Sequence, residues 1–163
     1  MEYRLWIDHY AAEADAPLKA IQGLSPADFS EFPIPGTWSI QQIVIHLMES
    51  DLIGTDRMKR VAAEGWPGKA PPLIVNYDES AFIQHLAPER IDPVKACELF
   101  RMNRELTAIM LRSLSADAFA RVGIHSHRGK LTLFDLVKGY VEHARGHLDH
   151  LKRKRAILGK PIG

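Results

Sequence analysis

The stretch YVEHARGHLDH, from Tyr140 to His150, contains three histidines, His143, His147 and His150. It lies inside a longer segment, from about Thr132 to Leu158, in which apolar residues recur at the spacing of an amphipathic helix. That apolar stripe comprises Leu133, Leu136, Val137, Tyr140, Ala144, Leu148 and Leu151. His147 falls within the stripe, and His143 and His150 fall at its edge. The segment therefore predicts one long helix that carries histidines toward the helices it packs against.

His143 and His147 are four residues apart, which places both side chains on one face of a helix, about 5–6 Å apart at Cβ. Two neutral imidazoles at that separation can bind one divalent metal ion such as Zn²⁺ or Ni²⁺. The HExxH pattern of metalloproteases is not met, because Ala144 follows His143. The spacing also suits solvated histidines near the negative end of a helix dipole, so by itself it leaves both interpretations open.

A second long helix is predicted within Thr37–Gly65, with Thr37 or Ser39 as its N-cap. Its apolar stripe comprises Ile40, Ile43, Val44, Leu47, Met58 and Val61. His46 falls at the edge of this stripe and is the candidate third metal ligand. Asp51 falls in the middle of the stripe. A buried carboxylate needs a partner, so Asp51 is either a catalytic base or ligand-orienting group, or the partner of an arginine such as Arg104 or Arg145.

Two further helices complete the prediction of an all-α fold, a four-helix bundle formed by one domain over residues 1–163. The first helix, from about residue 3 to 24, has an apolar stripe of Trp6, Tyr10, Ala14, Leu18 and Ile21. The third helix follows Asp92 as N-cap and Pro93, with a stripe of Leu99, Met102, Leu106, Ile109 and Met110. A long loop, including WPGKAPPL and a short helix in DESAFIQHLA, joins the second and third helices. No segment has the alternation of a convincing strand.

Composition narrows the function classes. The formal net charge is +1, which gives no global field that attracts nucleic acid, and the run KRKR at 152–155 suits a helix C-terminus. No apolar run approaches the roughly 18 residues of a membrane span, and the residues after Met1 do not resemble a signal peptide. We therefore expect a cytoplasmic protein without nucleic-acid or membrane partners. The single cysteine, Cys97, is expected to be an inert core thiol, and His125 and His127 to be solvated loop residues.

Two segments together resemble the DinB/YfiT-like superfamily. GTWSIQQIVIHLMESD, at 36–51, is similar to the second helix of that family, and HRGKLTLFDLVKGYVEHARGHLDHL, at 127–151, to its last helix. The resemblance implies an up-down-down-up bundle, a homodimer, and a divalent metal ion, Zn²⁺ or Ni²⁺, held by His46, His143 and His147. Glu49 and Asp51 stand where the family often has acidic residues, and Asp51 is the better catalytic candidate because it points inward.

The family includes transferases that use a low-molecular-weight thiol as co-substrate, and metal-dependent hydrolases. The resemblance therefore predicts a metal-dependent enzyme with a small-molecule substrate, either a thiol-dependent S-transferase or a hydrolase. Three histidine ligands leave a coordination position open, which is typical of catalytic sites. The alternative is a non-catalytic helical bundle with a stress-related or dimerisation role, in which the histidines are polar core residues.

Overall fold

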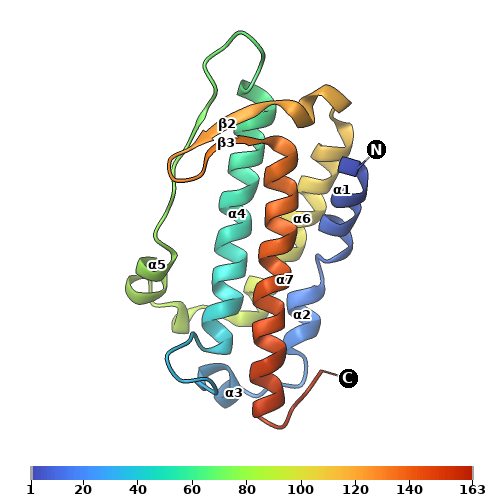
Figure 1. The fold of residues 1–163 in the computed structure, drawn as a ribbon. Helices are drawn as coiled ribbons and strands as arrows, with labels where there is room; N and C mark the ends of the chain where they lie inside the picture. Colours follow the sequence, from blue (N-terminus) through green and yellow to red (C-terminus); the bar gives the residue numbers. More distant parts are fainter. Residues whose placement is uncertain (1, 163) are drawn as a thin grey trace.

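The protein is described by a computed structural model over residues 2–162. Four helical segments form the bundle (Figure 1). These are α1 (Glu2–Ala12) with its continuation α2 (Ala16–Ile21), α4 (Ile40–Glu64), α6 (Pro93–Ser113) and α7 (Leu133–Ile157). Shorter elements join them: α3 (Pro26–Ser30), α5 (Glu79–His85), and 3₁₀ turns at Pro88–Arg90 and Ala116–Ala120. None of the helices within the described range is long and apolar enough to cross a membrane.

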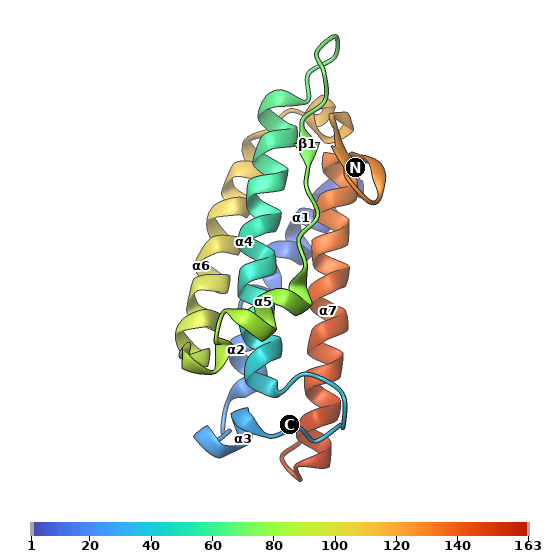
Figure 2. The same cartoon turned by 90° about the vertical axis from the view of Figure 1, so that its left-hand side faces the viewer.

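The four segments have the predicted up-down-down-up order. Helices α4 and α6 run in one direction, and α1 and α7 in the other (Figure 1). Because α4 and α6 are consecutive and parallel, the chain between them must return along the whole bundle. Figure 2 shows this connection, residues 65–92, running lengthwise beside α4 and α7. It contains β1 (Leu73–Ile74) and α5, and it brings residues far from either helix in sequence to the face that α4 and α7 share.

The first bundle segment is not one continuous helix. The sequence predicted a single helix to about residue 24, but α1 ends at Ala12 and α2 begins at Ala16. Pro17 lies in the first turn of α2. A proline there has no N–H to donate, and its ring would clash with the carbonyl one turn earlier in an uninterrupted helix. The chain therefore breaks before Pro17 and restarts.

Hydrogen-bonded caps begin the three long helices at the predicted places. Ser39, and not Thr37, caps α4 and forms a capping box with Gln42. Asp92 caps α6 directly before Pro93. Thr132 and Asp135 form the capping box of α7. Each cap satisfies backbone N–H groups that have no partner within the helix. The caps of α4 and α7 thereby set where His46, His143 and His147 lie along their helices.

A small sheet, absent from the sequence prediction, lies at one end of the bundle (Figure 1). Its strands are β1, β2 (Val122–His125) and β3 (Gly129–Thr132), in the order β1-β2-β3. β1 pairs in parallel with β2, and β2 pairs antiparallel with β3. Strands of two to four residues are too short for period-two alternation to be detected. The sheet fastens the long connection to the hairpin that precedes α7.

The apolar stripe predicted for α6 was largely wrong. Leu99, Met102, Leu106 and Ile109 are exposed, and only Met110 packs against the core. The buried face of α6 consists instead of Ala96, Cys97, Phe100, Arg104, Thr107, Ala108 and Leu111. The reason is that the face of α4 that packs against α6 carries buried polar groups, which need polar partners on α6. Arg104 meets Asp51, and the Thr107 hydroxyl lies 2.9 Å from that of Thr55.

The basic run at 152–155 has a structural role that the sequence did not indicate. Lys154 and Arg155 are buried. The guanidinium of Arg155 donates to the carbonyl oxygens of Ala20 and Gln22, at 2.7 and 2.8 Å. The Lys154 amine donates to the hydroxyl of Thr37. These two cations therefore fasten the end of α7 to the segments before α4.

Gly54 allows α4 and α7 to approach each other. A Cβ at this position would lie 2.6 Å from the Cε1 and Cζ atoms of Tyr140, a separation that nonbonded carbon atoms do not reach. The Tyr140 ring therefore occupies the space that a side chain at residue 54 would need. This contact places the Tyr140 hydroxyl beside the Arg57 guanidinium, at 2.9 Å.

We expect Gly54→Ala to lower the free energy of unfolding by about 1–3 kcal/mol, the usual cost of overpacking, although alanine is the better helix former. Gly146→Ala is the matched control, because Gly146 is also helical and a Cβ there meets nothing within 4 Å. The control should gain up to about 1 kcal/mol. Urea denaturation measures both, and equal stability of the two variants would contradict the tight contact.

Candidate metal centre

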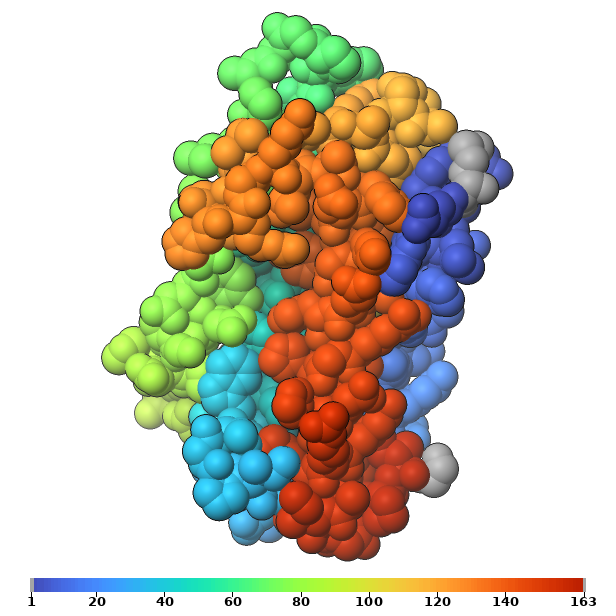
Figure 3. All heavy atoms as spheres, viewed as in Figure 1, coloured from blue at the N-terminus to red at the C-terminus, as the bar shows by residue number. Residues whose placement is uncertain are grey.

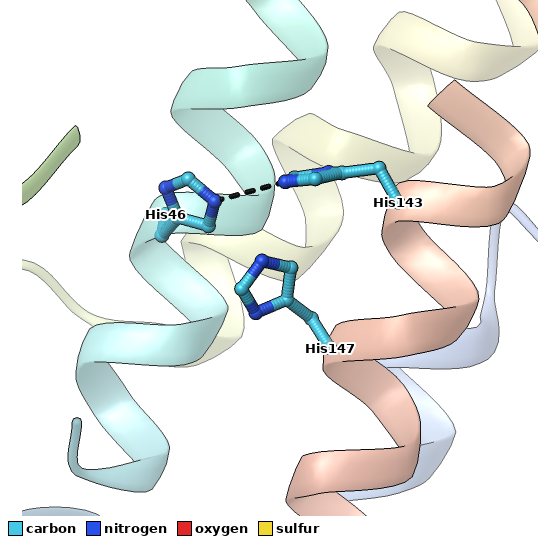
Figure 4. A group of neighbouring side chains, drawn as sticks. All are labelled: His46, His143 and His147. Atoms are coloured by element: carbon cyan, nitrogen blue, oxygen red, sulfur yellow. Dashed lines mark hydrogen bonds between the residues drawn. The ribbon is translucent and has the colours of Figure 1, made fainter. Parts of the chain in front are cut away.

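Three histidine side chains from two antiparallel helices meet in the interior. His46 comes from α4, and His143 and His147 from successive turns of α7; their rings point toward one another (Figure 4). The Nε2 atoms of His46 and His143 lie 3.1 Å apart. One ring nitrogen from each histidine lies within 4.8 Å of the other two. The structure therefore brings together the three residues that the sequence singled out as candidate ligands.

The surroundings keep these imidazoles neutral at pH 7. Burial lowers the pKa of His46 to about 3, and the neighbouring His147 and His143 add to the effect. Burial, followed by His147 and Arg104, lowers the pKa of His143 to about 4. The pKa of His147 is lowered to about 4, again mainly by burial. A neutral imidazole has the free lone pair that metal binding requires. The cluster thus presents three nitrogen donors to one point.

Trp38 covers one side of the cluster. Its ring is nearly parallel to that of His147, with 6.0 Å between centroids, and its centroid lies 4.9 Å from that of His46. On another side the carboxylate of Glu79, the first residue of α5, lies 3.5 Å from Nε2 of His46. Sequence reasoning did not identify Glu79. Its only sequence signal was its place in the first turn of the short helix predicted within the long loop.

A cavity of about 570 Å³ opens beside the cluster, with His143, Glu79 and Ser50 in its wall. The remaining wall comes from α4, the long connection, the β2–β3 hairpin and α7. Figure 3 shows the hollow between the hairpin and α5, with α4 visible at its floor. Its volume falls within the range of small-molecule sites, about 300–1,000 Å³. His46 is thus buried, His143 and His147 are partly buried, and His143 connects the cluster to the cavity.

Comparison with known proteins identifies the family. The sequence profile described as the DinB superfamily matches residues 9–151. The chain belongs to the DinB superfamily. It is 27% identical over 125 residues to a Bacillus licheniformis protein named "Putative metal-dependent hydrolase", covering 76% of this chain and 68% of that protein. It is 26% identical over 149 residues to the Bacillus subtilis (strain 168) protein named "Putative metal-dependent hydrolase YfiT", covering 89% and 81%.

A solved structure of YfiT from Bacillus subtilis has the same architecture. It superposes with a TM-score of 0.86 at 25% sequence identity, covering 96% of this chain and 87% of that one. That protein is described as "a probable metal-dependent hydrolase with an unusual four-helix bundle topology". The up-down-down-up order of this DinB chain, with its parallel α4 and α6, accords with that description.

Asp51, the predicted catalytic residue, lies in a closed polar network and not against the histidines. Its Oδ1 accepts from Nε of Arg104 at 2.9 Å, and both side chains are buried. Its Oδ2 accepts from the Tyr10 hydroxyl at 3.1 Å and from Nδ2 of Asn103 at 2.7 Å. These contacts favour the ion pair with Arg104 that the sequence left open, and a catalytic role of Asp51 stays an untested prediction. Glu49 is half-buried, and burial raises its pKa.

Three further histidines of the DinB chain, His125, His127 and His150, differ in their exposure, and one of them differs from the prediction. His150 is exposed, one turn beyond His147, and lies outside the three-residue cluster. His127 is exposed as predicted, but the prediction that His125 is solvated was wrong, because it is 5% exposed. His125 ends β2, and strand pairing draws it against the bundle. Cys97 is buried, and burial raises the pKa of its thiol to about 12, as expected for an inert core residue.

We expect Asp51→Ala to lower the free energy of unfolding by about 3–5 kcal/mol, because it leaves the buried Arg104 charge unpaired. Asp56→Ala is the control on the same helix, since Asp56 pairs with Arg60 at the exposed surface, and such pairs contribute about 0–1 kcal/mol. Urea denaturation at pH 7 compares the two variants. A stability loss for Asp51→Ala no larger than that of the control would contradict the structural role.

Proposed function

We propose that this DinB protein is a metal-dependent hydrolase acting on a small molecule, with one divalent ion held by His46, His143 and His147. The observation that carries the proposal is the convergence of three neutral nitrogen donors within 4.8 Å of one another beside an open cavity. The residues fit such an ion, because burial disfavours protonation of all three rings and Zn²⁺ and Ni²⁺ accept imidazole ligands. The names of the two Bacillus relatives support the same reading.

The ion supplies positive charge that lowers the pKa of a bound water or thiol and polarises a carbonyl group. The protein supplies the rest. Trp38 holds the rings of His46 and His147 by packing against them. Glu79 places a carboxylate 3.5 Å from the His46 ring, at the wall of the cavity. From there its oxygen can accept a proton from a nucleophile that enters the site, which is the task of a general base.

A thiol-dependent S-transferase is the second candidate, because a metal ion held by the same three ligands would lower the pKa of a bound thiol. The chain itself has no cysteine for that task. Cys97 is its single cysteine, and it is buried with a raised pKa. A reactive thiol would therefore have to enter the cavity as a diffusible co-substrate. Dependence of turnover on added low-molecular-weight thiol separates the two candidates.

The homodimer that the family resemblance implies stays a prediction. The exposed stripe of Leu99, Met102, Leu106 and Ile109 on α6 supports it, because contiguous exposed apolar surface commonly marks an interface. The non-catalytic alternative, a bundle whose histidines serve only packing or dimerisation, does not account for a cavity that reaches the cluster.

We expect about one divalent ion per chain in the purified, tag-free protein, and its loss in His147→Ala, because two imidazoles remain where three converge. His150→Ala is the control, since His150 lies one turn further along α7 and is exposed. Elemental mass spectrometry after exchange with Zn²⁺ or Ni²⁺ gives the stoichiometry. Absence of metal from the wild type, or equal metal in both variants, would refute the proposed centre.

We expect Glu79→Gln to reduce turnover of a hydrolysed substrate about 10²–10⁴-fold while the metal content stays unchanged, because the amide cannot accept the proton. Glu142→Gln is the control, because Glu142 is exposed on α7 and pairs with Lys138. Ester and amide libraries with the Zn²⁺-loaded protein provide the readout. Loss of metal from Glu79→Gln would instead make Glu79 a ligand, and unchanged turnover would exclude it as the base.

A further inference from the structure

The cavity beside the histidines has a second polar end, formed by Arg57 and the β2–β3 hairpin. Arg57 lies three turns of α4 beyond His46, about 16 Å along the axis at 1.5 Å per residue. Its Nη1 donates to the Tyr140 hydroxyl at 2.9 Å, and its Nη2 donates to the carbonyl of Val75 at 2.7 Å. These two neutral acceptors orient the guanidinium and leave its charge uncompensated.

Arg128 brings a second cation to the same wall. Among residues 2–162, the arginines with a carboxylate oxygen within 4.0 Å include neither Arg57 nor Arg128. Both side chains line the cavity. Two arginines thus place positive charge on the wall of one cavity without a carboxylate in direct contact, and an anion bound there would interact favourably with both.

His125 adds an aimed hydrogen-bond donor. Its Nδ1 accepts from the backbone N–H groups of His127 and Arg128, at 3.1 and 3.2 Å. With Nδ1 acting as acceptor, the hydrogen of the neutral ring must be on Nε2. Burial, with Arg57 and Arg128 nearby, lowers the pKa of His125 and keeps the ring neutral. The ring lines the cavity, so its Nε2–H is available to a bound molecule.

The acidic residues of the cavity wall are occupied elsewhere. Asp78 accepts from the backbone N–H of Ala81 as the N-cap of α5. Asp135 accepts from the backbone N–H and the hydroxyl of Thr132 as part of the α7 capping box. Glu79 lies against His46 at the opposite end. Asp78 and Asp135 thus have their hydrogen bonds at the helix starts, and Glu79 lies beside His46. Asp135 keeps its charge and interacts electrostatically with Arg128, but neither Arg128 nor Arg57 is among the described arginines that have a carboxylate oxygen within 4.0 Å.

We propose that Arg57, Arg128 and the Nε2–H of His125 bind an anionic group of the substrate, a carboxylate or a phosphate, and so restrict the substrate to anions. That the bound anion is a substrate rests on the proposed function. Binding of the anion itself does not, because it needs no metal. Arginine suits the task because its planar N–H groups match the oxygens of carboxylate and phosphate. A molecule anchored at this end extends through the cavity toward the histidines.

The test is calorimetric titration of the full chain with succinate, inorganic phosphate and uncharged succinamide. Each titration is run on Zn²⁺-loaded protein freed of excess metal and on chelator-treated protein. We expect one or both anions to bind in both forms, and succinamide in neither. Arg57→Met and Arg128→Met should each weaken binding of the anion about tenfold or more, because each removes a charged donor. Arg60→Met, on the same helix as Arg57 but paired with Asp56 at the surface, should bind as the wild type does.

Arg57→Met also removes the hydrogen bond to the Val75 carbonyl and could therefore disturb the fold. Arg128→Met avoids this problem, because the Arg128 side chain is exposed and makes no hydrogen bond in the described structure. Preference for succinate or phosphate identifies the anion. No binding of either anion would overturn the inference, as would equal affinity of both variants and the Arg60→Met control. Binding only to the Zn²⁺-loaded form, unaffected by the arginine variants, would place the anion at the metal and also overturn it. If the chelator-treated protein binds the anions but does not take up Zn²⁺ when the metal is added back, the proposed function is refuted and the anion site stands.

Discussion

The buried ion pair between Arg104 and Asp51 holds the bundle together. Arg104 extends from α6, donates to Asp51 on α4 at 2.9 Å, and donates to the carbonyl of Tyr140 on α7 at 2.9 Å. Its guanidinium also stacks on the Tyr10 ring of α1, 4.3 Å from the centroid. One side chain therefore contacts all the other bundle helices. Two charges removed from water cost several kcal/mol each, and the cost is offset only when every polar atom finds a partner. This need for matched partners gives the contact its specificity.

That constraint reaches the histidines through α7. The carbonyl bound by Arg104 belongs to Tyr140, one turn before His143. Because Arg104 also binds Asp51 of α4, the interaction fixes the axial position of α7 relative to α4. Tyr140 in turn packs on Gly54 and accepts from Arg57. The cluster is thus positioned by rigid helices and their polar core, while the cavity wall comes from the long connection and the hairpin. Rigid helices suit metal ligands, whose geometry must be held closely, and loops suit the wall of a binding cavity.

The sequence predicted the parts of this molecule that depend on local patterns. Asp92 could be recognised as a helix start because cap and helix period occur together; the starts near Ser39 and Thr132 followed from the helix period, with Thr37 left as an alternative cap to Ser39. His143 and His147 could be paired because helical spacing alone brings them together. The contact with His46 spans 97 residues and came from the family resemblance, since no local pattern encodes it. Leu106 and Ile109 were wrongly predicted to be buried. Apolar spacing does not show which face of a helix is buried when the neighbouring helix presents charges. Glu79 reaches the site because the long connection folds back along the bundle, and the Val75 carbonyl of that connection orients Arg57 of α4. Helical periodicity describes neither of these contacts.

His46, His143 and His147 converge, and we propose that they bind one divalent ion. X-ray absorption at the zinc edge, on protein loaded with one equivalent of Zn²⁺, tests the ligands themselves. We expect a shell of three imidazole nitrogens at about 2.0–2.1 Å together with one oxygen ligand from water, and loss of this shell in His46→Ala. A spectrum without the imidazole signature, or one that His46→Ala leaves unchanged, would show that the histidines meet for packing and not for metal.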